Sequence, residues 1–223
     1  MAKEKIDFLE HKFKLALNFE DAQKYDKAEE IYNSILQMRM DDPRATLGRA
    51  VARIIQNKMY DGLLDLSKAY LISDVEGKIR SALIYEEIGN AKEAYICFGE
   101  IVRDNPDNYN ANLNLARLDL FHGKKEDASN RLTNMIEKNP EIAEAYIQLA
   151  NINLIDKNID KSIELYEKSL TINPDNIYVL YTLTLAYLEK GDTNLALVHL
   201  NRGLELEPEN PTLLDIKKEI ENS

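Results

Sequence analysis

Four prolines recur at a fixed interval of 34 residues, at Pro106, Pro140, Pro174 and Pro208. An acidic residue follows each of them, and an asparagine precedes the first three. Such a strict period predicts one structural unit that is repeated along the chain. Stacked units of this kind build extended surfaces that bind other molecules, so the period indicates a binding protein and leaves its ligand open.

Each repeat contains two stretches in which apolar residues recur at helical spacing. In the last repeat, Leu180, Leu183 and Tyr187 belong to the first stretch, and Ala196 and Leu200 belong to the second. Residues at offsets of 3, 4 and 7 lie on one face of a helix. Each repeat is therefore predicted to be a pair of helices that pack through these faces.

The residues between and after these helices are typical of helix ends. Glycine suits the left-handed conformation that follows a helix, and it occurs at the same place in three repeats. These residues are Gly89, Gly123 and Gly191. The proline then ends the second helix, because the residue before a proline avoids the helical region. The next helix is expected to be capped by Asp107 or Asn108, and in the equivalent place by Asp175 or Asn176.

The period and these recurring positions resemble the tetratricopeptide repeat family. In the repeat at 143–176, Ala150 is the small residue at position 8, Tyr166 is the large residue at position 24, and Pro174 is the proline at position 32. The sequence departs from the family at position 4, where only Tyr146 is aromatic, and at position 8, where glycine is replaced. The resemblance implies an all-α, right-handed α-solenoid of about six helical hairpins with a C-terminal capping helix.

We expect one solenoid domain over residues 1–223. Its repeats are predicted at 9–42, 43–74, 75–108, 109–142, 143–176 and 177–210, with a capping helix at 211–223. The first repeat has Met40 where the proline would stand. The second is degenerate, and aligning its two apolar stretches leaves about two extra residues in the turn between its helices. The capping helix has one apolar face, which would cover the last repeat.

The net charge of −11 argues against nucleic acid or an anionic membrane as the partner, because both are bound through basic faces. The single cysteine, Cys97, excludes an internal disulfide. No stretch approaches the ~20 apolar residues that span a bilayer, so we expect no membrane insertion. The charged stretch 1–10 lacks the apolar run of a secretory signal, so we expect a cytoplasmic location.

Residues with catalytic or metal-binding chemistry are few and dispersed. The histidines His11, His122 and His199 belong to different repeats. Cys97 and His199 share one position in units three repeats apart, so spacings of ~10 Å between packed helices predict a separation beyond ~20 Å. A nucleophilic pair needs hydrogen-bond reach, and the sequence has no phosphate-binding or dinucleotide-binding fingerprint. We therefore expect no catalytic residue, no metal site and no cofactor.

The first helix of each repeat holds the candidate binding residues. The resemblance implies that positions 2, 5, 6, 9, 12 and 13 of this helix face a concave groove. In the three C-terminal repeats, the candidate peptide-binding residues are Asn110, Asn114, Arg117, Leu120, Phe121, Gln148, Asn151, Leu154, Tyr178, Tyr181 and Leu188. The repeat at 75–108 is charged at these positions, with Glu76, Arg80, Glu86 and Glu87.

Amides and leucines dominate this candidate set, and each kind has two interpretations. Amides donate and accept hydrogen bonds, which suits the backbone of an extended peptide, but they also serve simply to hydrate a surface. Leu120, Leu154 and Leu188 recur at one position. They form either an apolar stripe for an amphipathic ligand or the packing against the neighbouring repeat.

Some members of this family clamp a C-terminal carboxylate with Lys and Asn at positions 5 and 9. Here those positions hold Phe13 and Leu17 in one repeat, and Leu113 and Arg117 in another, so binding of acidic chaperone tails is not expected. We predict a non-enzymatic protein–protein interaction scaffold that binds a protein partner, as a peptide or helix, in its concave groove. The alternative is a structural protein that forms homo-oligomers through its terminal repeats.

Overall fold

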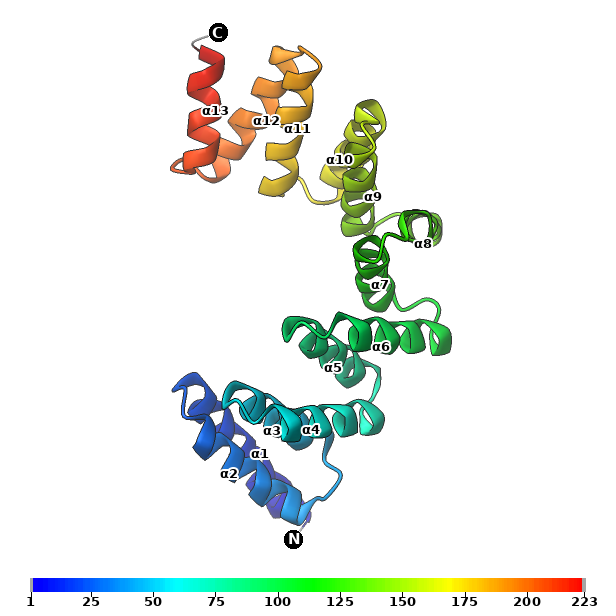
Figure 1. Cartoon of the computed structure of the whole chain (residues 1–223). Coiled ribbons are helices and arrows are strands. Elements are labelled where there is room, and N and C mark those ends of the chain that lie inside the picture. The colour runs from blue at the N-terminus through cyan, green and yellow to red at the C-terminus, as the bar shows by residue number, and fades with distance from the viewer. Residues whose placement is uncertain (1, 222–223) are drawn as a thin grey trace. The chain divides into compact units, whose positions relative to one another are not determined.

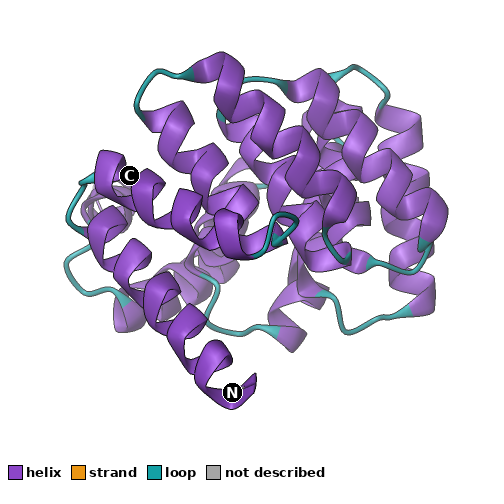
Figure 2. Cartoon of the chain, turned by 90° about the horizontal axis from the view of Figure 1, so that it is seen from below, coloured by secondary structure: helices purple, strands orange, loops and turns teal. Residues whose placement is uncertain are grey.

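A computed structural model describes residues 2–221, with side chains from residue 7 onward. Within that range every regular element is an α-helix (Figures 1 and 2). This confirms the predicted all-α class. In chain order the helices are α1 (Ala2–Asp21), α2 (Tyr25–Met38), α3 (Pro43–Ile55), α4 (Met59–Ile72), α5 (Val75–Glu87), α6 (Ala91–Asp104), α7 (Tyr109–Phe121), α8 (Lys125–Lys138), α9 (Ala143–Ile155), α10 (Ile159–Ile172), α11 (Ile177–Glu189), α12 (Thr193–Leu206) and α13 (Pro211–Glu221).

A turn of three residues joins the two helices of each pair, from α1 and α2 to α11 and α12. The middle residue has positive φ in all six turns. The predicted left-handed conformation of the three glycines is confirmed, with φ of 79° at Gly89, 74° at Gly123 and 78° at Gly191. Side chains occupy the same conformation at Gln23, Asn57 and Lys157. Since a side chain disfavours this conformation, each of these three turns carries a local energetic cost.

The links between successive pairs differ in length at one place. Four residues separate α2 from α3 and α6 from α7, whereas only Ser73 and Asp74 separate α4 from α5. The expectation of two extra residues in the turn between α3 and α4 was therefore wrong, because the second repeat is instead two residues short in the link that follows α4. The predicted caps fall on Asn108 and Asn176. The side chain of each accepts a hydrogen bond from the backbone N–H of the residue three places further along the chain.

A small residue occupies the same place on the second helix of every pair. Buried there are Ala28, Gly62, Ala94, Ala128, Ser162 and Ala196. At Gly62, an added Cβ would lie 2.6 Å from Cγ1 of Ile54 on the facing helix. The paired helices therefore approach closely at this position, and a larger side chain would force them apart.

The chain divides into two compact units, residues 1–111 and 112–223. In the first unit, α1, α2 and α3 share a core built around Phe13, Tyr32 and Ile35. In the second unit, one core joins α7, α8 and α9, and another joins α9, α10 and α11 around Tyr166 and Leu183. Leu213 of α13 packs with α12, so the C-terminal helix covers an apolar face of that unit. The bounds of the six repeats and of a single domain stay a prediction.

Candidate functional site

An open cavity of about 1000 Å³ lies in the first unit, along the first helix of each of its three helix pairs. Residues of α1, α3 and α5 form most of its lining, and we call it the first-helix groove. From α1 come Glu10, Phe13, Lys14, Leu17 and Glu20; from α3, Pro43, Arg44, Leu47, Gly48 and Val51; and from α5 and the link before it, Ser73, Asp74, Glu76, Gly77, Arg80, Leu83, Ile84 and Glu87.

The floor of the groove depends on Tyr32, which reaches it from α2. Its ring lies beside Gly48, where an added Cβ would be 2.3 Å from Cζ of Tyr32. The absence of a side chain at Gly48 thus makes room for the tyrosine. The Tyr32 hydroxyl donates to Oε1 of Glu20 at 3.0 Å. Burial raises the pKa of Glu20 above its ordinary value.

An apolar row crosses the groove from α1 to α5. Leu17 is 53% exposed, and Leu47, Val51 and Leu83 are half-buried. Each of these side chains belongs to a helix whose opposite face is packed in the core. The row therefore offers apolar surface to a ligand without needing any rearrangement of the fold.

Charged side chains border this row, five acidic and three basic. The Arg44 guanidinium donates to Glu10 at 2.8 Å and lies 4.1 Å from the centre of the Phe13 ring. Arg80 bonds to Glu76 at 2.5 Å. Two of the three cations are thus engaged with acids of the border, and the groove is acidic on balance. It suits a ligand that carries apolar and basic side chains.

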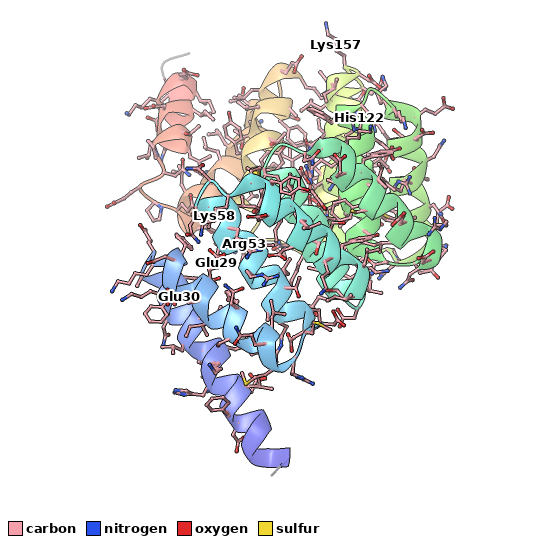
Figure 3. The ribbon with its side chains drawn as sticks, turned by 60° about the horizontal axis from the view of Figure 1, so that its bottom comes forward. Glu29, Glu30, Arg53, Lys58, His122 and Lys157 are labelled. Atoms are coloured by element: carbon pink, nitrogen blue, oxygen red, sulfur yellow. The ribbon has the colours of Figure 1, made fainter. Side chains whose placement is uncertain are left out.

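A separate network of charges ties α2, α3 and α4 together, and the sequence pattern did not reveal it. Asp65 accepts from Arg49 at 2.7 and 2.8 Å and from Arg53 at 2.8 Å. Glu29 accepts from Arg53 at 2.8 Å and from Lys58 at 2.6 Å, and these three side chains lie close together in Figure 3. Burial by itself would raise the pKa of Glu29, but these bonds outweigh it and lower the pKa to about 2. The network holds the helices that support the groove.

Two of the predicted amides of the second unit, Asn114 and Asn151, form hydrogen bonds with other side chains. Asn151 is half-buried, and its Oδ1 accepts from the hydroxyls of Tyr166 and Tyr178, the latter at 2.8 Å. Asn151 therefore does more than hydrate the surface, since it accepts a hydrogen bond from a buried tyrosine. Arg117 donates to Asn114 at 3.1 Å on the surface of α7. Oε1 of Gln148 is buried and accepts no bond within the described residues.

Two of the three predicted groove leucines take part in the cores of the second unit. Leu120 packs against the core of α7, α8 and α9, and Leu188 packs with Tyr181 against the core of α12 and α13. These contacts favour the packing interpretation for both leucines. Leu154 is half-buried.

Of the other candidates, Asn110 and Phe121 are exposed, and Tyr178 is half exposed. Asn110 precedes the division between the units, so its placement beside the rest stays a prediction.

Cys97 and His199 are both buried side chains. Burial raises the pKa of the Cys97 thiol to about 12. His199 stacks on Tyr187 and lies 3.0 Å from Oε1 of Glu167. The two residues belong to different units, so their predicted separation stays a prediction. Among the described side chains, no group of three or more His, Cys, Asp or Glu is placed to hold a metal ion. No helix in the described range is long and apolar enough to cross a membrane.

Comparison with known proteins decides the family. Two models of the tetratricopeptide repeat match residues 113–177 and 153–220. The chain belongs to the tetratricopeptide repeat family. Its stacked helix pairs are those of a protein-interaction scaffold.

The chain is also similar to curated relatives in sequence and to solved structures in fold. BBSome complex member BBS4 of Bos taurus is 30% identical over 55% of this chain, and the match spans only 24% of that protein. PilW, a type IV pilus biogenesis factor, shares the fold with a TM-score of 0.70 at 17% identity, covering 94% of this chain and 98% of its own. YrrB, a tetratricopeptide repeat protein with an unusual peptide-binding site, has a TM-score of 0.57 at 17% identity, covering 84% and 97%.

The tetratricopeptide repeat positions also account for the first-helix groove. Positions 2, 5, 6 and 9 of the repeats that begin at residues 9, 43 and 75 lie on α1, α3 and α5. All of them line the cavity, with the single exception of Ile79. The first-helix groove was not predicted from the sequence, because the candidate residues were taken from the C-terminal repeats and the register of the second repeat was left open. α3 begins at Pro43, the first residue of the predicted second repeat, so the family positions counted from this residue give the groove lining of α3.

Proposed function

We propose that this chain is a non-enzymatic scaffold that binds a peptide or helix of a protein partner in the first-helix groove. One observation carries the proposal: the same positions of three successive repeats line a single open cavity. Its apolar row and charged border are features of sites that hold a segment of another protein. The solved YrrB structure is described as having a peptide-binding site, which is in keeping with this function.

The chemistry of the groove suggests the kind of segment. Apolar side chains of the ligand would cover the exposed face of Leu17 and the half-buried Val51 and Leu83. A basic side chain would lie near Glu20 or Glu87, at the C-terminal ends of α1 and α5. We therefore propose a peptide with alternating or amphipathic apolar residues and at least one Lys or Arg beside them.

The candidate residues of the second unit remain part of the proposal as a second contact region. The exposed or half-exposed side chains there are Arg117, Phe121 and Tyr178. Phe121 is 74% exposed at the end of α7, which is unusual for an aromatic side chain without a partner molecule. We also propose a cytoplasmic location and no binding of nucleic acid. The alternative function is self-assembly through the terminal repeats.

Selection from a random peptide library, followed by titration of one selected peptide against the full chain, tests the proposal. Leu17→Glu places a charge in the middle of the apolar row, at a side chain exposed enough to leave the fold intact. We expect at least a tenfold loss of affinity, which corresponds to about 1.4 kcal/mol. Arg80→Glu, at the border of the groove, should change affinity in the direction set by the charge of the selected peptide.

The matched control removes an exposed ion pair elsewhere. Glu164 and Lys168 bond to each other at 3.0 Å on the outer surface of α10. The double change Glu164→Ala and Lys168→Ala should leave the affinity unchanged. If this control weakened peptide binding while Leu17→Glu did not, the first-helix groove would not be the binding site.

A further inference from the structure

A stripe of exposed apolar side chains runs along α4, outside the first-helix groove. Tyr60 is 81% exposed, Leu64 is 62% exposed and Leu71 is 72% exposed. Ser67 is exposed between the two leucines. The spacings of 4, 3 and 4 residues place all four side chains on one face of the helix. The stripe thus extends over nearly the whole length of α4.

The second helices of the other pairs carry mostly polar residues at the three places that Tyr60, Leu64 and Leu71 occupy on α4. They hold Asp26, Glu30 and Gln37 on α2; Lys92, Ile96 and Arg103 on α6; Glu126, Asn130 and Glu137 on α8; Asp160, Glu164 and Thr171 on α10; and Asn194, Val198 and Glu205 on α12. A fold of this kind therefore does not require apolar side chains there. Only α4 exposes three of them.

The neighbouring helix α6 also exposes an apolar side chain at one of these places. Tyr70 of α4 donates to the carbonyl of Cys97 at 3.2 Å and to Glu100 at 2.9 Å, so α4 and α6 lie side by side. Ile96 of α6 is 48% exposed and occupies the same place in its repeat as Leu64 does in its own. Several exposed apolar side chains gathered on one helix face are typical of an interface.

We propose that α4 pairs with α4 of a second copy of this chain, in antiparallel orientation. The stripe is symmetric about its centre. Antiparallel pairing therefore brings Tyr60 against Leu71 of the second copy, and Leu64 against Ser67 of the second copy. A two-fold interface needs a surface that is complementary to itself, and this stripe meets that condition.

The charges beside the stripe favour this orientation. Asp61 and Lys68 are seven residues apart, so they lie on the same flank of α4. In an antiparallel pair, Asp61 of each copy comes near Lys68 of the other, and the interface gains two pairs of opposite charges. Lys68 bonds to Asp41 at 2.9 Å in the single chain, but this pair lies at the surface, with the Lys68 side chain 42% exposed and that of Asp41 64% exposed. Such pairs contribute little, so Lys68 is able to change partners.

The size of the surface sets the strength of the association. A helix of 14 residues is about 21 Å long. One helix face of that length, even with Ile96, covers less than the roughly 1,200–2,000 Å² buried by stable complexes. The dimer is therefore weak, with a dissociation constant on the order of micromolar or above, and it forms only as the concentration rises.

Sedimentation equilibrium of the full chain across a range from about 1 to 500 μM tests the proposal. The variant Tyr60→Asp, Leu64→Glu and Leu71→Gln gives α4 the residues that α2 has at the same places, so the fold tolerates them. The natural chain should self-associate, and the dissociation constant of the variant should rise at least tenfold. Val198→Glu removes a 60% exposed apolar side chain from α12 and should leave the association unchanged.

Disulfide formation reports the orientation. In an oxidised mixture of the Leu64→Cys and Ser67→Cys chains, antiparallel pairing gives mainly mixed dimers, because these two positions face each other. Parallel pairing gives Leu64→Cys linked to itself, which would overturn the proposed geometry. The proposal as a whole is overturned if the natural chain stays monomeric throughout the range, if the α4 variant associates as strongly as the natural chain, or if Val198→Glu abolishes association.

Discussion

Arg131 donates through Nε to Oδ2 of Asp119 at 3.2 Å, and this pair links α8 to α7. Asp119 is fully buried, and Arg131 also donates to Asn112. In the second repeat, Arg53 and Asp65 occupy the same two positions with the charges exchanged, at 2.8 Å. The facing positions of a helix pair thus accept an acid and a base in either order.

Because either order is accepted, exchanging the pair should be tolerated. Arg131→Ala leaves a buried carboxylate without its cation, and we expect a loss of at least about 2 kcal/mol in the free energy of unfolding. The double change Asp119→Arg and Arg131→Asp should recover at least half of that loss. Urea unfolding of the three chains measures this. An exchanged pair as unstable as the single variant would show that the local surroundings fix the order.

The low pKa of Glu29 makes the first unit sensitive to acid. The folded chain favours the carboxylate form of Glu29, so its pKa falls from 4.5 to about 2. The resulting stabilisation of the fold is present above about pH 4.5 and is lost as the pH falls toward 2. Glu29→Gln should lower the free energy of unfolding by about 1–3 kcal/mol at pH 7. Denaturant titrations at pH 7 and pH 3 should show this difference shrinking at the lower pH.

Glu30 provides the matched control, because it is the exposed neighbour of Glu29 on α2. Glu30→Gln should change stability by less than about 0.5 kcal/mol at both pH values. An equal pH dependence of the two variants would mean that the network around Glu29 does not govern the acid response.

The small residues between paired helices should resist enlargement. Ala196 is fully buried on α12. Ala196→Leu inserts a side chain where the helices touch, and we expect it to lower the free energy of unfolding by about 1–3 kcal/mol. Val198→Leu, at an exposed place on the same helix, is the comparison and should be nearly neutral. A denaturant midpoint of Ala196→Leu equal to that of the natural chain would disprove the assigned helix contact.

Asn151 should contribute to folding as well as to any ligand contact. Asn151→Ala leaves the hydroxyl of the buried Tyr166 without its acceptor, and we expect a loss of about 1–3 kcal/mol. Adding Tyr166→Phe removes the donor too and should restore much of the stability. Thermal unfolding of the single and double variants measures both effects. If Tyr166→Phe brought no recovery, the hydrogen bond would not be the cause.

The repeating architecture could be predicted from the sequence because it depends on local signals. The left-handed turn at Gly123 follows from residue type and spacing alone, and the same signals narrowed the cap to Asp107 or Asn108, of which the structure selects Asn108. The two extra residues expected in the turn between α3 and α4 are absent, and the link at Ser73 and Asp74 is instead two residues shorter than the other links. Residue spacing alone does not distinguish an insertion before α4 from a deletion after it. Because the register of the second repeat was left open, Leu47 and Val51 were not predicted as residues of the groove.

The candidate residues of the second unit show a different limit. Position in the repeat identified Asn151 correctly as a residue of the first helix, but not its tyrosine partners, which lie 15 and 27 residues away. The same limit applies to Leu120 and Leu188, because periodicity does not separate a leucine that meets a ligand from one that packs on the next helix pair. Contacts between repeats decide this.

A crystal structure of the full chain with a library-selected peptide tests the central claim most directly. We predict that the peptide lies across α1, α3 and α5, with an apolar side chain against Leu17 and Val51 and a basic side chain near Glu20 or Glu87. A peptide bound to the second helices, or to α9 and α11 alone, would contradict the assignment of the first-helix groove as the binding site.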